Sequence, residues 1–197
     1  MMITKFRSSA AMLLVGLSVT GCMTMADEMP ATSANAGASV MVGGAAMYPN
    51  RTIVENAVNS RDHTTLVAAV TAAGLVETLS GPGPFTVFAP TNAAFAKLPA
   101  GTVETLLQTA NRSTLQSVLT YHVVPGTLTA ADLMARIKAG GGRAQLTTVQ
   151  GGKLTASMMG DRIMLVDAKG GMSHVTQANV TQSNGVIHVT DGVSLPG

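Results

Sequence analysis

The eleven residues at positions 85–95, FTVFAPTNAAF, constrain the fold of this chain more than any other stretch. Phe85, Val87 and Ala89 occupy every second position, which is the period of a β-strand with one face buried. Pro90 follows them, and proline cannot donate a hydrogen bond to a neighbouring strand. The stretch therefore predicts a core strand that ends abruptly.

The second part of this stretch carries the signals that begin a helix. Thr91 or Asn92 can cap a helix with a side-chain oxygen, and Phe95 falls in its first turns. Apolar groups on both the strand and the helix are expected to pack into one core. We therefore predict a strand, a sharp corner and a short helix.

A second stretch near the C-terminus, NGVIHVTDGVSLP at 184–196, has a similar pattern of strands and turns. Asn184 and Gly185 predict a turn, and His188 lies in the strand that follows. Asp191 flanks the next turn, where aspartate ordinarily serves by Asx-type hydrogen bonding. We expect this stretch to be the partner of the first.

Helical patterns come first in the rest of the chain and strand patterns come second. Apolar spacing predicts helices at 52–59, from 62 or 64 to 74, at 102–108, from 111 or 113 onward, and at 129–140. A strand is expected at 121–126, and short β-rich runs separated by glycine turns follow at 146–149, 153–157, 163–166, 174–180 and 186–193. This order predicts the α+β class, with helices packed on an antiparallel sheet.

Composition excludes some classes of function. Apolar residues make up 46% of the chain but aromatic residues only 3%, so the core must be built from Val, Leu, Ala and Met. Charged residues make up 11%, and no run of Lys or Arg occurs. Nucleic-acid binding requires clustered cations, so we expect no nucleic-acid partner.

The N-terminus predicts a leader at residues 1–21. Lys5 and Arg7 precede an uncharged apolar run at 10–19 that is too short for a stable membrane span, as in a secretory signal. The residues Val-Thr-Gly-Cys at 19–22 resemble a bacterial lipobox, in which the cysteine is acylated and becomes the mature N-terminus. An ordinary signal peptide cut after Ala26 is the alternative.

Cys22 is the single cysteine of the chain, so no disulfide framework is available. A multiply acylated Cys22 would hold the protein on a bilayer. Because Met23 follows instead of aspartate, analogy with Gram-negative lipoproteins favours the outer membrane, with the periplasm or secretion as the other addresses. Residues 22–49 are rich in small residues and are expected to form a flexible tether, and their methionines lack the nearby His or Cys of a metal site.

Three stretches, FTVFAPTNAAF at 85–95, LTYHVVPG at 119–126 and NGVIHVTDGVSLP at 184–196, resemble the fasciclin domain. Their order and spacing fit one whole domain over residues 50–197. The resemblance implies helices beside a β-sandwich-like half, with the first and last motifs as adjacent core strands. It also implies adhesion, matrix contact or surface recognition instead of catalysis.

Tyr121 and His122 match a Tyr-His pair of that family. The structural interpretation is a buried histidine whose hydrogen bond fixes a helix to a strand, with the tyrosine packed beside it. Direct contact with a partner is the alternative.

Chemical motifs are mostly absent. The four histidines, at 63, 122, 174 and 188, lack the close spacing of a zinc site, so we expect no metal and no cofactor. No GxSxG elbow and no phosphate-binding glycine loop occurs, so we expect no enzyme; a lipid-anchored hydrolase would need a convergent Ser, His and Asp. Methionines recur in the second half, either as an adaptable apolar surface or as core filler, at positions 134, 158, 159, 164 and 172.

Two hypotheses follow from the sequence. The first is a lipid-anchored surface module of a bacterial envelope that recognises a surface protein or a polysaccharide, with weak self-association left open. The second is a binder of a small ligand in a cleft, either an apolar molecule such as a carotenoid or a sugar.

Overall fold

The computed structural model describes residues 39–197. The predicted leader, Cys22 and the first part of the predicted tether lie outside these residues, so these three expectations stay predictions. Within residues 39–197, no helix is both long enough and apolar enough to cross a membrane.

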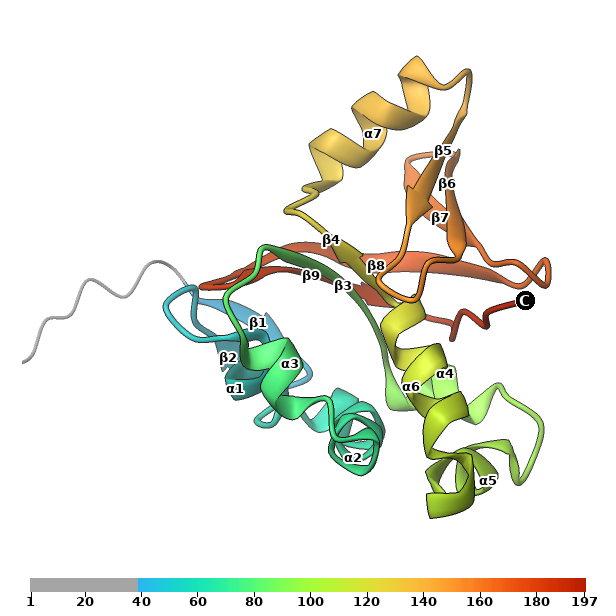
Figure 1. Ribbon diagram of the computed structural model, residues 1–197. Coiled ribbons are helices and arrows are strands. Elements are labelled where there is room, and N and C mark those ends of the chain that lie inside the picture. Colours follow the sequence, from blue (N-terminus) through green and yellow to red (C-terminus); the bar gives the residue numbers. More distant parts are fainter. Residues whose placement is uncertain (1–38) are drawn as a thin grey trace, which may run out of the picture. The chain divides into compact units, whose positions relative to one another are not determined.

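Short helices dominate the first half of the described chain (Figure 1). Those before the first core strand are α1 (Ile53–Ala57), the 3₁₀ turn η1 (Arg61–His63), α2 (Thr64–Ala73) and α3 (Val76–Ser80). Those after it are α4 (Asn92–Ala96), α5 (Thr102–Leu107), the 3₁₀ turn η2 (Thr109–Asn111) and α6 (Arg112–Tyr121). Leu66, Ala69 and Val70 of α2 are buried in the contact between α2 and other helices, chiefly α6.

Seven strands form one sheet in the order β4-β3-β9-β8-β7-β6-β5. Their bounds are β3 (Phe85–Pro90), β4 (Val123–Pro125), β5 (Arg143–Thr147), β6 (Lys153–Met159), β7 (Arg162–Val166), β8 (Met172–Gln182) and β9 (Gly185–Thr190). The sheet curls until β4 and β5 are in contact, and α7 (Ala130–Ala139) packs on β5, β6 and β7. The α+β class is confirmed, and the expected β-sandwich-like half is this single curled sheet.

The two motif stretches lie side by side at the centre of the sheet. β3 and β9 are parallel, and Val87 pairs with Ile187. The expectation that the first and last motifs are adjacent strands is confirmed, and β3–β9 is the one parallel pair within the seven-stranded sheet. The Asn-Gly turn is displaced by one residue, because Gly185 already pairs with Gln182 and only residues 183 and 184 form the turn.

β3 is buried on both faces, and the prediction of one buried face was therefore wrong. Val87 and Ala89 belong to a core shared with α1, α2 and α6, which we call the helical core. Phe88 belongs to a second core inside the curled sheet, which we call the sheet core. Thr86, on the same face as Phe88, is also fully buried. Parallel strands are ordinarily buried on both faces. The alternation of side chains in the sequence indicates one buried face, and it does not show whether other elements also bury the opposite face.

The expected tether is also corrected. Residues 40–47 form a hairpin of β1 (Val40–Val42) and β2 (Ala45–Met47), and the helical core includes Val42 and Met47. Met47 is 1% exposed. The glycines that suggested flexibility at 43 and 44 form the hairpin turn, where both have positive φ. Residues 40–47, which the sequence assigned to the tether, therefore belong to the folded domain.

The corner after β3 joins three elements. Thr91 is the N-cap of α4, and its hydroxyl accepts a hydrogen bond from the backbone N–H of Ala94 at 3.3 Å. Asn92 instead caps the neighbouring helix α2, because its Oδ1 accepts from the N–H of Thr65 at 3.0 Å. Phe95 is buried in the helical core, as predicted. One corner thus fixes β3, α4 and α2 together.

Gly185 allows β9 to approach β3 closely. A Cβ atom at this position would lie 2.0 Å from the backbone oxygen of Phe85. Backbone atoms of a central strand cannot move aside without breaking the ladder of hydrogen bonds. Only glycine fits here.

We predict that Gly185→Ala lowers the free energy of unfolding by about 3 kcal/mol or more, measured by urea denaturation. Gly160→Ala is the matched control, because Gly160 has φ +65° but no atom within 4 Å of the added Cβ. The control should lower the free energy of unfolding by only about 1–2 kcal/mol, which is the cost of placing alanine in a left-handed backbone conformation. Equal losses for the two variants would contradict close approach as the reason for this glycine.

Candidate functional site

Asn184 connects the C-terminal motif to the helices. Its Oδ1 accepts a hydrogen bond from the N–H of Ile53 at 3.0 Å, and its Nδ2 donates to the carbonyls of Leu79 at 2.8 Å and Gly81 at 3.0 Å. Its own carbonyl accepts from the N–H of Phe85 at 3.0 Å. This one amide therefore satisfies backbone groups at the start of α1 and the end of α3.

Tyr121 and His122 lie at the end of α6, so the expectation that they belong to a strand was wrong. Tyr121 is the last residue of α6, and His122 is its C-cap. Tyr121 is fully buried; its hydroxyl donates to the carbonyl of Lys153 at 2.6 Å and accepts from the N–H of Ala168 at 3.1 Å. The helix carries the tyrosine into the sheet core before β4 begins.

His122 uses both ring nitrogens inside the protein. Nδ1 lies 2.8 Å from the carbonyl of Val118 and must donate to it, while Nε2 accepts from the N–H of Ser194 at 2.9 Å. The ring is therefore neutral, and burial lowers its pKa. If Nε2 were protonated, its N–H would point at the N–H of Ser194, and neither donor would have an acceptor. These bonds tie α6 to the C-terminal segment and favour the structural interpretation of the Tyr-His pair.

Two further histidines are buried in separate places. His188 lies 2.7 Å from the carbonyl of Leu128 through Nε2, and its ring stacks on Phe88 with centroids 5.6 Å apart. His63 pairs through Nδ1 with the hydroxyl of Ser60 at 2.8 Å. Burial lowers the pKa of each. Within residues 39–197, no group of three or more His, Cys, Asp or Glu side chains is placed to hold a metal ion.

Asp167 is a buried carboxylate in the turn between β7 and β8. Its Oδ1 accepts from the N–H groups of Lys169 at 2.9 Å and Gly171 at 2.7 Å, which is Asx-type hydrogen bonding. Its Oδ2 also accepts from the N–H of Leu195 at 2.8 Å. This last bond anchors the C-terminal segment, and nothing in the local sequence pattern signals it.

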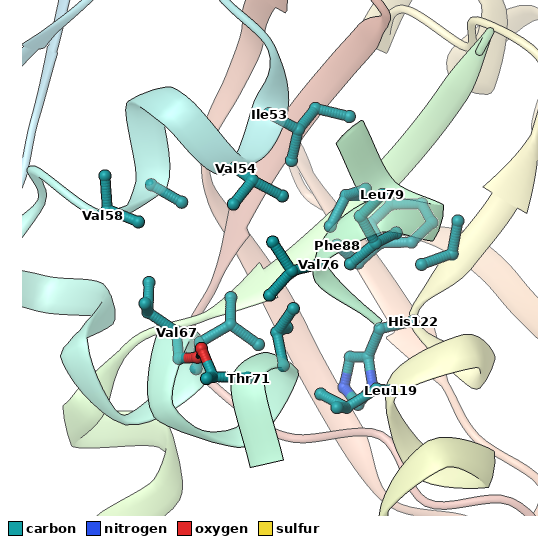
Figure 2. Close-up of a pocket in the computed structure, with 15 residues that line it drawn as sticks. Ile53, Val54, Val58, Val67, Thr71, Val76, Leu79, Phe88, Leu119 and His122 are labelled. Carbon is teal, nitrogen blue, oxygen red and sulfur yellow. Dashed lines mark hydrogen bonds between the residues drawn. The ribbon is translucent and has the colours of Figure 1, made fainter. Parts of the chain in front are cut away.

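The structure contains an apolar pocket of about 140 Å³ between α1, α2, α3 and the centre of the sheet (Figure 2). Ile53, Leu79 and Leu119 are buried in its wall, while Val58 and Thr71 are exposed at its edge. His122 also lines it, but both of its ring nitrogens are bonded elsewhere. The pocket can hold an apolar group by burial, and it offers no free polar side chain for catalysis.

The methionines of the second half differ in their surroundings. None of the five at positions 134, 158, 159, 164 and 172 is fully buried, but Met158 packs against the sheet core. Met159 is 59% exposed and Met172 is 67% exposed.

Comparison with known proteins gives a consistent result. The family model for the Fasciclin domain matches residues 61–196. The chain is 48% identical over 158 residues to protein sll1483 of Synechocystis sp., an alignment that covers 80% of this chain and 81% of that protein. It is 38% identical over 143 residues to immunogenic protein MPB70 of Mycobacterium bovis, covering 70% of this chain and 65% of that protein.

A solved structure shares the fold. The FAS1 domain pair from the insect cell adhesion molecule fasciclin I superposes with a TM-score of 0.65 at 17% identity, covering 79% of this chain and 57% of that one. This likeness concerns the fold alone.

We predict that the protein loses stability as the pH falls below about 6.5. Burial lowers the folded-state pKa of His63, His122 and His188 below the unfolded value near 6.5. The unfolded chain then binds more protons, so stability is complete above pH 6.5 and decreases below it by up to about 1.4 kcal/mol per pH unit for each histidine. Urea denaturation between pH 5 and 8 measures this dependence.

The control is His174→Gln, because the side chain of His174 is 31% exposed. This variant should keep the pH dependence, whereas His122→Gln should reduce its slope by the share of one histidine and leave the shares of His63 and His188. Stability that is constant from pH 5 to 8 would contradict the neutral, buried rings.

Proposed function

This chain belongs to the fasciclin domain family, and from that premise we propose that it is a non-enzymatic module that recognises another surface or an extracellular polymer. The observation that carries the proposal is the match to the family model over residues 61–196. The structural neighbour comes from an insect cell adhesion molecule, and at 17% identity it supports only the shared fold of such a module.

The internal hydrogen bonding supports a binding role over a catalytic one. The rings of His122 and His188 and the carboxylate of Asp167 are committed to backbone groups that hold elements together. A general base or a nucleophile needs a side chain that faces a substrate. These three groups face the interior, so they are not available to act as a general base or a nucleophile.

We propose further that the protein is exported and held on a bilayer through acylated Cys22. The lipobox-like residues 19–22 and the small-residue segment after them support this. Such an anchor would present the folded part at a membrane surface. The anchor would raise the effective concentration of the protein near a partner at that surface, so weak contacts suffice.

We expect the partner to be bound with little dependence on salt, because only 11% of the residues are charged. The test is capture of partners from envelope and medium fractions on the whole chain carrying Cys22→Ser. Binding should change by less than about threefold between 50 and 500 mM NaCl. Treating the fractions with protease or with periodate separates protein from polysaccharide partners. A tenfold loss of binding at 500 mM NaCl, or the absence of any retained partner, would contradict the proposal.

A second candidate function rests on the apolar pocket. A cavity of about 150 Å³ lined by aliphatic side chains stays dry and holds a benzene-sized molecule. The pocket here, at about 140 Å³, therefore suits a short aliphatic chain or a single ring. A carotenoid is several times larger, and a sugar would find one hydroxyl, that of Thr71, which already donates to the carbonyl of Val67. We propose a small apolar ligand.

We predict that Ala57→Leu abolishes this binding, because Ala57 lines the pocket and the larger side chain fills it. Extraction of bound molecules followed by mass spectrometry, and titration with a fluorescent apolar probe, measure the loss. Val149→Phe is the control, because Val149 is exposed and lies outside the pocket. Equal probe binding by the wild type and by Ala57→Leu, at equal melting temperature, would exclude the pocket as the site.

A further inference from the structure

The outward face of strands β6, β7 and β8 carries methionines in an ordered arrangement. Met164 of β7 pairs with Ser157 of β6 on one side and with His174 of β8 on the other. Paired residues project to the same face of a sheet. Ile163 and Leu165, the neighbours of Met164, are buried in the sheet core, so Met164 and His174 project away from it.

Two more methionines project from the same face. Met172 lies two residues before His174 on β8, and Met159 lies two residues after Ser157 on β6. Residues two apart in a strand share a face. Met159 pairs with Arg162 and Met172 with Val166, so these two methionines lie on opposite sides of Met164. The side chains that meet are two thioethers and one imidazole, which we call the Met-His cluster: Met159, Met164 and His174.

The ring of His174 is oriented on both sides. Its Nδ1 lies 3.4 Å from Oδ2 of Asp191, and its Nε2 lies 3.4 Å from the sulfur of Met159. Asp191 itself is held, because its Oδ1 accepts from the backbone N–H of His174 at 2.7 Å. Without an ion, Nε2–H can donate to the sulfur, which only accepts. With Nδ1–H directed at the carboxylate, Nε2 instead presents a lone pair to an ion, as in metal sites with a carboxylate behind the ligating histidine.

The distance between Nε2 and the sulfur suits two ligands of one ion. Metal–nitrogen bonds of about 2.0 Å and metal–sulfur bonds of about 2.3 Å at a near-tetrahedral angle place the two atoms about 3.5 Å apart. The contact between Met159 and His174 also crosses over β7, where Met164 pairs with His174 and Arg162 pairs with Met159. The thioether of Met164 is therefore a second sulfur ligand beside the same point.

The floor of the cluster contains an unpaired polar atom. Ser157 is 9% exposed, and its hydroxyl has no hydrogen-bond partner within the described residues. Buried hydroxyls without a partner are uncommon and indicate an unseen ion or water. A water bound to an ion in the cluster would supply the partner.

We propose that the Met-His cluster binds a soft monovalent cation, Cu(I). Thioether sulfur is a soft ligand that favours Cu(I), and a neutral imidazole completes the set. The nearby charges also favour a monovalent ion over a divalent one. Lys97 lies 3.6 Å from Asp191, and Arg162 pairs with Met159 across β6 and β7.

The test uses the whole chain with Cys22→Ser, which removes the one competing thiol, and methionine methyl groups labelled with carbon-13. Ag(I) serves as the probe because it has the same ligand preference and no redox chemistry. One equivalent should shift the methyl signals of Met159 and Met164 and leave that of Met134 unchanged. Met134 is the internal control because it is 43% exposed on α7, outside the cluster.

Cu(I) affinity is then measured by competition with a chelator. His174→Gln and Met159→Leu should each weaken binding at least tenfold, and Met134→Leu less than twofold, with all melting temperatures preserved. Zn(II) should not compete. The proposal is overturned if the first equivalent of Ag(I) moves no cluster methyl, if it moves all exposed methionines alike, or if it moves only Met23, Met25 and Met29. Unchanged affinity in His174→Gln would also overturn it.

Discussion

The parallel pairing of β3 with β9 is the contact on which the rest of the structure depends. These strands lie 100 residues apart in the chain, with Phe85 opposite Gly185, and they separate the helical core from the sheet core. β3 contributes Val87 and Ala89 to the helical core and Phe88 to the sheet core. β9 contributes Ile187 and Val189 to the helical core, and its His188 stacks on Phe88. Gly185 permits the close approach, and Asn184 joins the same point to α1 and α3.

Buried neutral histidines hold the elements that surround this pair. His188 connects β9 to the segment before α7, and His122 connects α6 to the C-terminal segment. Each ring combines a donor and an acceptor, so it can join two backbone groups where no regular ladder of hydrogen bonds exists. The histidines that looked most like functional candidates in the sequence thus hold elements of the fold together, and our proposals for binding rest on the apolar pocket and on exposed surfaces such as the Met-His cluster.

The sequence predicted much of the fold because the spacing of apolar residues and the residue types of turns and helix caps are local features. The corner at Thr91, the short helices and the glycine-separated strands follow from such patterns. The adjacency of the two motifs was implied by the resemblance to the fasciclin domain. The second buried face of β3 and the insertion of Met47 into the core depend on contacts between distant segments, which a local pattern cannot contain. The prediction that Tyr121 and His122 lie in a strand was wrong because apolar residues at the end of a helix resemble the start of a strand.

The candidate site was less predictable for the same reason. The pocket is formed by side chains from α1, α2, α3, β3 and α6, and no single stretch of sequence encodes it. The methionines were visible as a recurring residue type, but their spacing did not distinguish a packed interior from an exposed face. Strand register resolves this, because it places Met164 beside His174.

Native-state hydrogen exchange tests the central claim most directly. The amides of Phe88 and Val189 should exchange only through global unfolding, and the slowest amides of the helical half and of the curled sheet should share that same free energy. Exchange of β3 and β9 at a markedly lower free energy than the rest of the sheet, with the two halves opening independently, would contradict the account.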